Sequence, residues 1–450
     1  MMRLLCRAVC VVVGAALLGS FATPLYSETD TETPRATGER LRGILDPTFN
    51  ETGTAFPPLT PYVVEEGQAV TMQSNDRIVV ATTVSDPATD VPAEQKGIVL
   101  WRYLSDGSLD TSFGVDGRVS LILPDVRVST IATQPDGKIL VGGSTRDGGD
   151  YAQATLIRFE EDGTLDIAFG DSGIVRKSDP FGTETTTTIV LQEDGRILAG
   201  LIRQMPLAVP AAQFIISRYN ADGTLDTDFG EEGFVNVYIV GTTYGDVIGV
   251  NVQSDGRIRV VGYYRNRTLD DHLTYVDLSS QGSILAPSQA VPIDNGAFTA
   301  GTVQADNSWI VAQGTEDGYG LVRYGSDGTI DQEFGSEGLA HIPTLMDNRE
   351  NTAISILPNG IITVVEQGQI DSTESLVVAQ FSPRGDINWM ATTTRSTDTL
   401  PGGFVVQEDG KPVVVAKTPS DTNEDEQVVL LRYDTESFWF IGMPFISGGP

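Results

Sequence analysis

Few residues in this 450-residue chain have the types and spacing that catalysis requires. Its two histidines, His272 and His341, lie far apart in the sequence, so a histidine-rich metal site is excluded. A lone histidine is more often structural or exposed than catalytic. The 61 carboxylates are too numerous for a glycosidase pair to stand out, and no nucleophile elbow, phosphate loop or Asp-box occurs. We therefore assign no catalytic residue and expect a protein that is not an enzyme.

Two kinds of acidic segment have the composition of calcium ligands. Residues 421–425 begin like an EF-hand loop, but Glu426 stands where that loop requires glycine, and Arg432 where it requires its closing glutamate. Aspartate-rich corners such as 222–228 are explained by turn formation without a metal. We expect no cofactor and no metal, with calcium at these corners as the open alternative.

An arginine and an aspartate eight residues later occur together in four places. Two other copies lack both residues and have instead Asp277 with Leu285, and Gln380 with Asn388. We infer that the arginine reaches the aspartate across a tight corner and clamps neighbouring repeats with a charge-assisted pair, for which Gln380 and Asn388 would be a neutral substitute. The phenylalanine three residues after each aspartate should pack beneath the clamp, which stabilises by about 1.5–3 kcal/mol when the ring is buried. The four sets are Arg102, Asp110 and Phe113; Arg158, Asp166 and Phe169; Arg218, Asp226 and Phe229; and Arg323, Asp331 and Phe334.

The first and last copies each carry half of such a clamp. Arg432 has no aspartate eight residues later, and Asp46 with Phe49 has no arginine before it. If the repeats close into a ring, these two halves meet. We predict an Arg432–Asp46 pair at the point of closure, covered by the aromatic tail 438–440.

Three loops of unusual length or composition are candidates for ligand or partner contact. Aromatic and arginine residues are over-represented in binding centres, which favours the loop that leads from Tyr263 to His272. The apolar loop 205–210 and the acidic insertion 85–96 are the other two, and a purely structural role fits each loop as well. The candidate contact residues are Tyr263, Tyr264, Arg265 and Arg267 in the first loop, and Met205 and Leu207 in the second.

These residues belong to a sequence that repeats at intervals of 50 to 61 residues. Each repeat holds two tight corners, and apolar segments such as 117–121, 129–134, 138–142 and 154–159 predict four strands per repeat. Helical periodicity is absent after the N-terminal leader. An all-β fold follows, a seven-bladed β-propeller of four-stranded antiparallel blades, because ring closure protects the sheet edges. The first corner of each repeat is centred on Asp76, Asp136, Asp194, Asp255, Asp306, Asn359 and Asp409.

The repeat unit resembles that of the delta-60 repeat family. Its best copies combine Leu-Asp-x-x-Phe-Gly, at 109–114 and 165–170, with Asp-Gly-Lys/Arg-Ile-Leu, which begins at Asp136 and Asp194. The resemblance extends from residue 44 to about 435. It implies a secreted bacterial propeller-like protein, and it brings no catalytic residue with it.

The ends of the chain predict export. Residues 1–27 have the basic start, apolar run and small residues of a signal peptide, and both cysteines lie within them. We interpret 28–42 as a flexible linker and 441–450 as a tail. The propeller would occupy 43–440, with repeats at about 43–108, 109–164, 165–224, 225–283, 284–329, 330–386 and 387–440.

The net charge limits the partners that we expect. A formal charge of −32 repels nucleic acid and anionic membranes, and the mature chain should be periplasmic or secreted, monomeric and not inserted in a membrane. Corners of one kind share one face of a propeller, so the loops of variable length crowd the opposite face, called here the long-loop face. We predict a binding or scaffold propeller that engages a protein or an envelope glycan through this face. The alternative is a hydrolase or lyase that acts on a sugar or lactone in the central channel.

Overall fold

The computed structural model describes most of the chain after residue 44. The described ranges are 45–58, 63–85, 96–178, 182–204, 211–240, 242–266, 271–286, 289–291, 298–315, 318–342, 352–370, 373–394, 400–419 and 426–435. The predicted signal peptide, linker and tail, loop 205–210 and segment 421–425 lie outside them.

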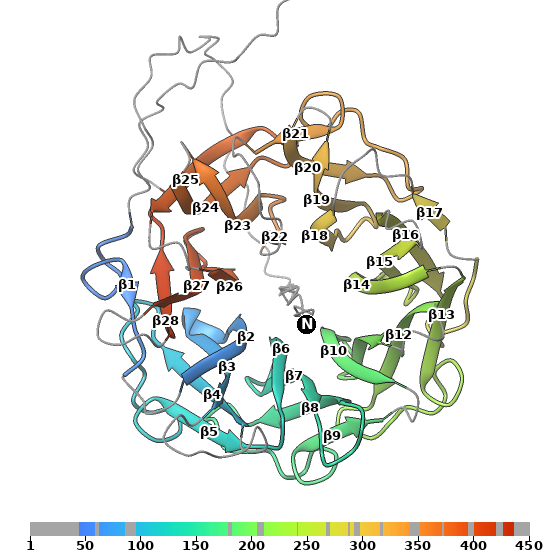
Figure 1. Cartoon of the computed structure of the whole chain (residues 1–450), viewed down its shortest axis with the longest axis horizontal. Coiled ribbons are helices and arrows are strands. Elements are labelled where there is room, and N and C mark those ends of the chain that lie inside the picture. The colour runs from blue at the N-terminus through green and yellow to red at the C-terminus, as the bar shows by residue number, and fades with distance from the viewer. Residues whose placement is uncertain are drawn as a thin grey trace, which may run out of the picture.

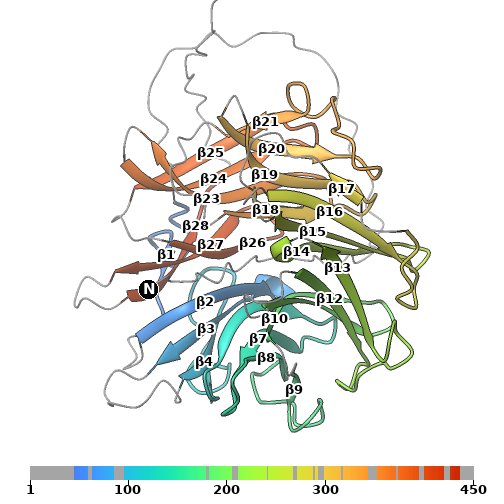
Figure 2. The ribbon, with the colours of Figure 1, turned by 45° about the vertical axis from the view of Figure 1, so that its right-hand side comes forward.

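The described residues form seven four-stranded antiparallel sheets arranged as blades around a central axis (Figure 1). The prediction of a seven-bladed all-β propeller is confirmed. Consecutive strands of a blade run from the innermost outward, and Figure 2 shows the ring at an oblique angle. No helix within these ranges is long and apolar enough to cross a membrane.

The first three blades follow one another along the chain. Blade 1 contains β2 (Val63–Met72), the 3-10 turn η1 (Ser74–Asp76), β3 (Ile78–Ser85), β4 (Lys96–Tyr103) and β5 (Arg118–Ile122). Blade 2 contains β6 (Arg127–Thr133), β7 (Ile139–Thr145), β8 (Gln153–Phe159) and β9 (Ile174–Lys177). Blade 3 contains β10 (Thr183–Leu191), β11 (Ile197–Gln204), β12 (Ala211–Tyr219) and β13 (Phe234–Val240).

The remaining blades complete the ring. Blade 4 contains β14 (Thr242–Val252), β15 (Ile258–Asn266), β16 (Asp271–Leu278) and β17 (Gln289–Val291). Blade 5 contains β18 (Phe298–Val303), β19 (Trp309–Thr315), β20 (Gly318–Tyr324) and β21 (Leu339–His341). Blade 6 contains β22 (Thr352–Ile356), β23 (Ile362–Ile370), β24 (Thr373–Phe381) and β25 (Ile387–Thr394). Blade 7 contains β26 (Leu400–Val406), β27 (Pro412–Pro419), β28 (Glu426–Arg432) and, from the other end of the sequence, β1 (Thr54–Ala55).

Tight corners set the register of each blade. At the first corner of blade 2, the Asp136 carboxylate accepts the backbone N–H of Lys138, and Gly137 has φ +84°, a conformation that glycine adopts without strain. At the second corner, a Cβ on Gly163 would lie 2.8 Å from the ring of Phe113. Glycine is therefore required there both for the turn and for close packing against the preceding clamp.

The hydrophobic core is divided among the junctions between blades. Val79, Ile98 and Leu100 of blade 1 pack against Ile139 and Val141 of blade 2. Comparable clusters join each of the remaining pairs of neighbouring blades. Because both faces of a blade are buried, its central strands are nearly continuous runs of apolar residues.

Candidate functional site

Each clamp joins one blade to the next through an arginine on the third strand. Arg102 Nε lies 2.8 Å from Asp110 Oδ2, and Arg102 Nη1 donates to the backbone carbonyl of Glu161 in blade 2 at 2.6 Å. The guanidinium carbon lies 4.5 Å from the centre of the Phe113 ring, which is fully buried. The arginine thus combines an ion pair, a cation–π contact and a hydrogen bond across the junction.

The same arrangement recurs at the other junctions where the pattern predicts it. The arginine–aspartate distances are 2.8 Å for Arg158–Asp166, 2.7 Å for Arg218–Asp226, 2.7 Å for Arg323–Asp331 and 2.9 Å for Arg432–Asp46. At the last of these, Phe49 lies beneath Arg432, and Lys411 Nζ adds a second cation 2.8 Å from Asp46. The tail 438–440, predicted to cover this closure, lies outside the described residues.

The two junctions that lack the arginine–aspartate pair are joined by other contacts. In blade 4 the cation comes from the second strand, because Arg259 pairs with Asp277 at 2.7 Å and stacks on Tyr275. Our prediction that Gln380 pairs with Asn388 is wrong, since Gln380 accepts from the indole of Trp389 at 2.7 Å and donates to the carbonyl of Gly410 at 3.2 Å. The indole lies within reach because Trp389 is the cross-strand partner of Gln380.

The clamp carboxylates are held as anions by protein donors. Burial by itself would raise the pKa of Asp46, but hydrogen bonds from Lys411 and Thr48 outweigh it and lower that pKa to about 2. The pKa of Asp226 is also lowered, because bonds from Arg218 and Arg196 outweigh the effect of burial. At the neighbouring corner, Asp222 accepts from the backbone and hydroxyl of Thr224. Calcium binding at these corners stays an untested alternative; within the described ranges no group of three or more His, Cys, Asp or Glu is placed to hold a metal.

The residues predicted to contact a partner do not form one site. Tyr263 is 2 % exposed and packs in the core between blades 4 and 5, so its assignment to a contact surface is wrong. The ring of Tyr264 stacks on His272 with 5.0 Å between the ring centres, and Arg265 is half-buried. Arg267, Met205 and Leu207 lie outside the described residues.

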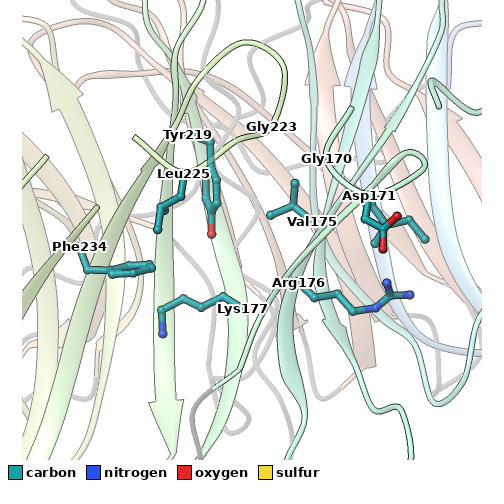
Figure 3. A pocket seen from close by; sticks show the side chains of 10 residues that line it. Gly170, Asp171, Val175, Arg176, Lys177, Tyr219, Gly223, Leu225 and Phe234 are labelled. Atoms are coloured by element: carbon teal, nitrogen blue, oxygen red, sulfur yellow. The ribbon is translucent and has the colours of Figure 1, made fainter. Parts of the chain in front are cut away.

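A pocket of about 310 Å³ lies between the outer strands of blades 2 and 3. Figure 3 shows Val175 and Lys177 of β9 facing Tyr219, Leu225 and Phe234 of the blade 3 side. The Lys177 ammonium lies 4.9 Å from the centre of the Phe234 ring. Burial raises the pKa of Tyr219 to about 12, so its hydroxyl is a neutral hydrogen-bonding group at physiological pH.

A buried ion cluster adjoins the pocket where β9 ends and β10 begins, on the side of the long loops. Glu184 is fully buried, and its two carboxylate oxygens accept from Lys177 Nζ at 2.7 and 2.6 Å. Arg203 Nε and Nη2 donate to the same carboxylate at 2.9 and 2.7 Å. The Lys177 and Arg203 side chains are only 13 % and 12 % exposed.

The equivalent positions at the junction of blades 1 and 2 are apolar or neutral. Lys177 pairs with Ala154, four residues before the clamp Arg158, just as Leu121 pairs with Ile98, four residues before Arg102. By the same register Val126 corresponds to Glu184, Thr145 to Arg203, and Phe159 to Tyr219. Leu121, Val126 and Phe159 belong to one continuous core cluster, whereas the core between blades 2 and 3 is divided into two.

Sequence reasoning missed this pocket, although a signal for it was present. A lysine and a glutamate stand where the neighbouring repeat has Leu121 and Val126. Only the register of the strands shows that these positions lie side by side, because they belong to different strands of different blades.

Comparison with protein families supports the repeats. Residues 73–113, 134–169 and 211–229 match the domain of unknown function DUF5122, described as a β-propeller. Three stretches of the chain therefore match a propeller repeat family, and the resemblance to the delta-60 family stays a prediction. No curated protein gave a significant match.

Solved structures that resemble this one include enzymes. A puromycin hydrolase aligns with a TM-score of 0.50 and 17 % identity over 82 % of this chain and 52 % of its own, so the chain spans about half the length of that hydrolase. The polysaccharide lyase Uly1 aligns with a TM-score of 0.47 and 11 % identity, over 83 % of this chain and 91 % of the lyase. These identities show a shared fold alone.

This comparison corrects the prediction that the protein is not an enzyme. That prediction does not stand, because the puromycin hydrolase shows that an enzyme can have the fold of this chain. The absence of catalytic motifs in the sequence does not exclude catalysis, since a propeller can assemble a site from residues on several blades.

Proposed function

We propose that this protein is an exported propeller that binds an envelope or extracellular glycan and seats one sugar unit in the pocket between blades 2 and 3. The observation that carries the proposal is the pocket itself, in which polar side chains replace the apolar residues of the neighbouring junction. The ion cluster at its edge lies on the side of the long loops, which is the side expected to serve recognition.

The size of the pocket favours a small chemical group over a protein surface. Ligand pockets commonly have volumes of about 300–1,000 Å³, and 310 Å³ is at the small end of that range. A standard protein interface instead buries about 800 Å² on each partner over a wider area.

The chemistry of the lining fits a sugar ring. Val175, Leu225 and Phe234 offer an apolar surface to the C–H groups of a pyranose. The Lys177 ammonium, and the Tyr219 hydroxyl beside its hydrogen bond with Ser217, offer hydrogen bonds to the hydroxyl groups of the sugar. A purely apolar ligand would leave the third donor of the Lys177 ammonium, the one that Glu184 does not accept, without a partner.

A glycan-binding assay with matched tyrosine variants tests the proposal. The chain from residue 28 is applied to immobilised envelope and matrix polysaccharides. For each polysaccharide that binds, the affinity is measured by calorimetry. Tyr219→Phe removes one hydroxyl and retains the packing, since Phe159 fills the equivalent position. We expect about a fivefold loss of affinity, the effect of one hydrogen bond.

Tyr103→Phe is the matched control, because Tyr103 occupies the same position in blade 1 and its hydroxyl is buried without a hydrogen-bond partner. Each ligand is recovered and analysed by mass spectrometry, so that cleavage is detected as well as binding. Absence of binding to any glycan, or equal affinities of the two variants, would contradict the proposal.

A further inference from the structure

The buried ion cluster of Lys177, Glu184 and Arg203 is difficult to explain as a stabilising feature. Two cations and a carboxylate must lose most of their water there, and such a cluster is often no more stable than apolar residues of similar volume. At the neighbouring junction the equivalent positions are apolar, and Leu121 and Val126 there belong to one core cluster. The cluster therefore requires a reason other than blade packing.

The contacts of Lys177 indicate what that reason is. Its ammonium has three donors, and two are directed at the Glu184 oxygens while Phe234 lies beside it. The third donor remains for a group in the pocket. Glu184 is saturated by its two cations, so it fixes Lys177 in place and does not itself offer a free acceptor to a ligand.

Arg176 lines the pocket through β9, but its guanidinium points away from Lys177, because successive residues of a strand face opposite sides and Ile174 packs in the core between blades 1 and 2 (Figure 3). The Arg176 side chain is exposed and, unlike the clamp arginines, it makes no ion pair with any described residue. In a chain with a formal charge of −32, a cation in a pocket is a local exception, and Lys177 lies on the side of β9 that faces Tyr219 and Phe234. Salt at physiological concentration screens the distant negative charges over about 8 Å, so the charged groups at the pocket itself, Lys177 and Asp171 among them, set its potential.

We propose that the pocket selects a carboxylate-bearing sugar, a uronic acid unit, with Lys177 as the residue that contacts the carboxylate and Glu184 and Arg203 as the residues that position Lys177. This inference rests on the proposed glycan binding and adds the charge of the ligand. A charged acceptor strengthens a hydrogen bond to an ammonium relative to a neutral ester, by about tenfold in affinity for one such contact.

The test compares an acidic sugar with its neutral ester. Calorimetry gives the affinities of the chain from residue 28 for tri-galacturonate, for its fully methylated ester and for the corresponding neutral galactose trimer. We expect the acid to bind about tenfold more tightly than the ester. Equal affinity for acid and ester would overturn the inference and leave the proposed function standing, whereas absence of binding to all three probes and to the polysaccharide panel would overturn both.

A variant that copies the neighbouring junction separates recognition from folding. Lys177→Leu, Glu184→Val and Arg203→Thr together reproduce Leu121, Val126 and Thr145. We expect this triple variant to have an unchanged or higher Tm and to lose the preference for acid over ester. Retention of the tenfold preference would overturn the inference, and so would a fall in Tm with the preference intact, since the cluster would then be structural.

Arg146→Ser is the control for net charge. It changes the charge by the same −1 as the triple variant, and it removes an exposed cation that pairs with Asp125 at 3.5 Å. We expect its ratio of acid to ester affinity to equal that of the unmodified protein. A fall in this ratio as large as that of the triple variant would show a general charge effect and overturn the assignment to Lys177.

Discussion

Arginine is required in the clamps because no other side chain makes all of their contacts at once. The guanidinium of Arg218 is planar, so it stacks on Phe229 while Nε binds Asp226 and Nη1 donates to the carbonyl of Ser280 in the next blade. A lysine at this position would present a single charged point. At the residue scale the clamp is therefore a three-way contact and not only an ion pair.

Loss of a buried clamp arginine should cost far more than loss of an exposed one. Arg218 is fully buried, and Arg218→Met leaves the carbonyl of Ser280 and one face of Asp226 without a donor. We expect the free energy of unfolding to fall by about 3 kcal/mol or more. Arg257→Ala, at an ion pair whose partners are about half exposed, should cost less than about 1 kcal/mol. Urea denaturation measures both, and equal losses would contradict this account.

The closure carboxylate should make stability depend on acidity. The pKa of Asp46 is lowered from 3.8 to about 2 in the folded chain, so its stabilising contribution is complete above pH 4 and is lost as the pH falls toward 2. Urea midpoints between pH 6 and pH 2 are compared for the unmodified chain and Asp46→Asn. The difference between them should shrink below pH 4, and a constant difference would show that Asp46 does not titrate in this way.

Among the elements, the third strand and the linker after it carry most clamps, and blade 4 shows that the strands can exchange roles. Arg259 on β15 takes the place of an arginine on β16, and Asp277 stands where the other blades have that arginine. Both arrangements place a guanidinium over an aromatic ring and against a carbonyl of the next blade. The geometry of the junction is preserved although the residues that make it have moved.

Blade 4 should therefore accept the clamp of its neighbours. Arg259→Leu alone leaves Asp277 unpaired and should cost about 3 kcal/mol. The combination Arg259→Leu, Asp277→Arg and Leu285→Asp rebuilds the standard pair, since the backbone N–H of Leu285 already donates to Asp277 as that of Asp110 donates to Arg102. We expect thermal unfolding of this triple variant to lie closer to the unmodified protein than that of the single variant. The reverse order would show that the two arrangements are not interchangeable.

At the scale of the whole molecule, stability depends on joining the two ends of the chain. The backbone N–H of Asp46 donates to the carbonyl of Arg432, and that of Arg432 to the carbonyl of Gly53, so the seam repeats the backbone pattern of an internal junction. Blade 7 takes its outermost strand, β1, from the start of the propeller (Figure 1). The ring cannot close until residues near both ends have folded together.

Removal of the closing segment should open the ring. A chain that begins at residue 57 lacks Asp46, Phe49 and β1, and it leaves the buried Arg432 without its ion pair. We expect a lower Tm and self-association through the exposed edge of β28, measured by thermal unfolding and light scattering. A chain that begins at residue 43 is the control and should behave as the unmodified protein. Equal behaviour of the two truncations would show that the segment 45–56 does not close the ring.

The fold and most residues of the clamps could be predicted from the sequence alone. Repeated corners and alternating strands predict a propeller because they are local patterns, and the joint presence or absence of Arg102-type and Asp110-type residues is visible when the repeats are compared. The sequence did not identify the partners of Asp277 and Gln380, since these come from a neighbouring strand and depend on register. Tyr263 was misplaced for the same reason, because a tyrosine near a loop can face either side of its strand.

The position of the candidate site became apparent from the three-dimensional packing of the blades. Lys177, Glu184 and Phe234 come from three strands in two blades, and sequence spacing does not specify which of their side chains share a junction. A blade buries both of its faces, so the role of a polar residue depends on the side chains that the next blade places opposite it. In the sequence Lys177 is one of many charged residues. In the structure it lies beside Glu184 and Phe234 and distinguishes this pocket from the neighbouring junction.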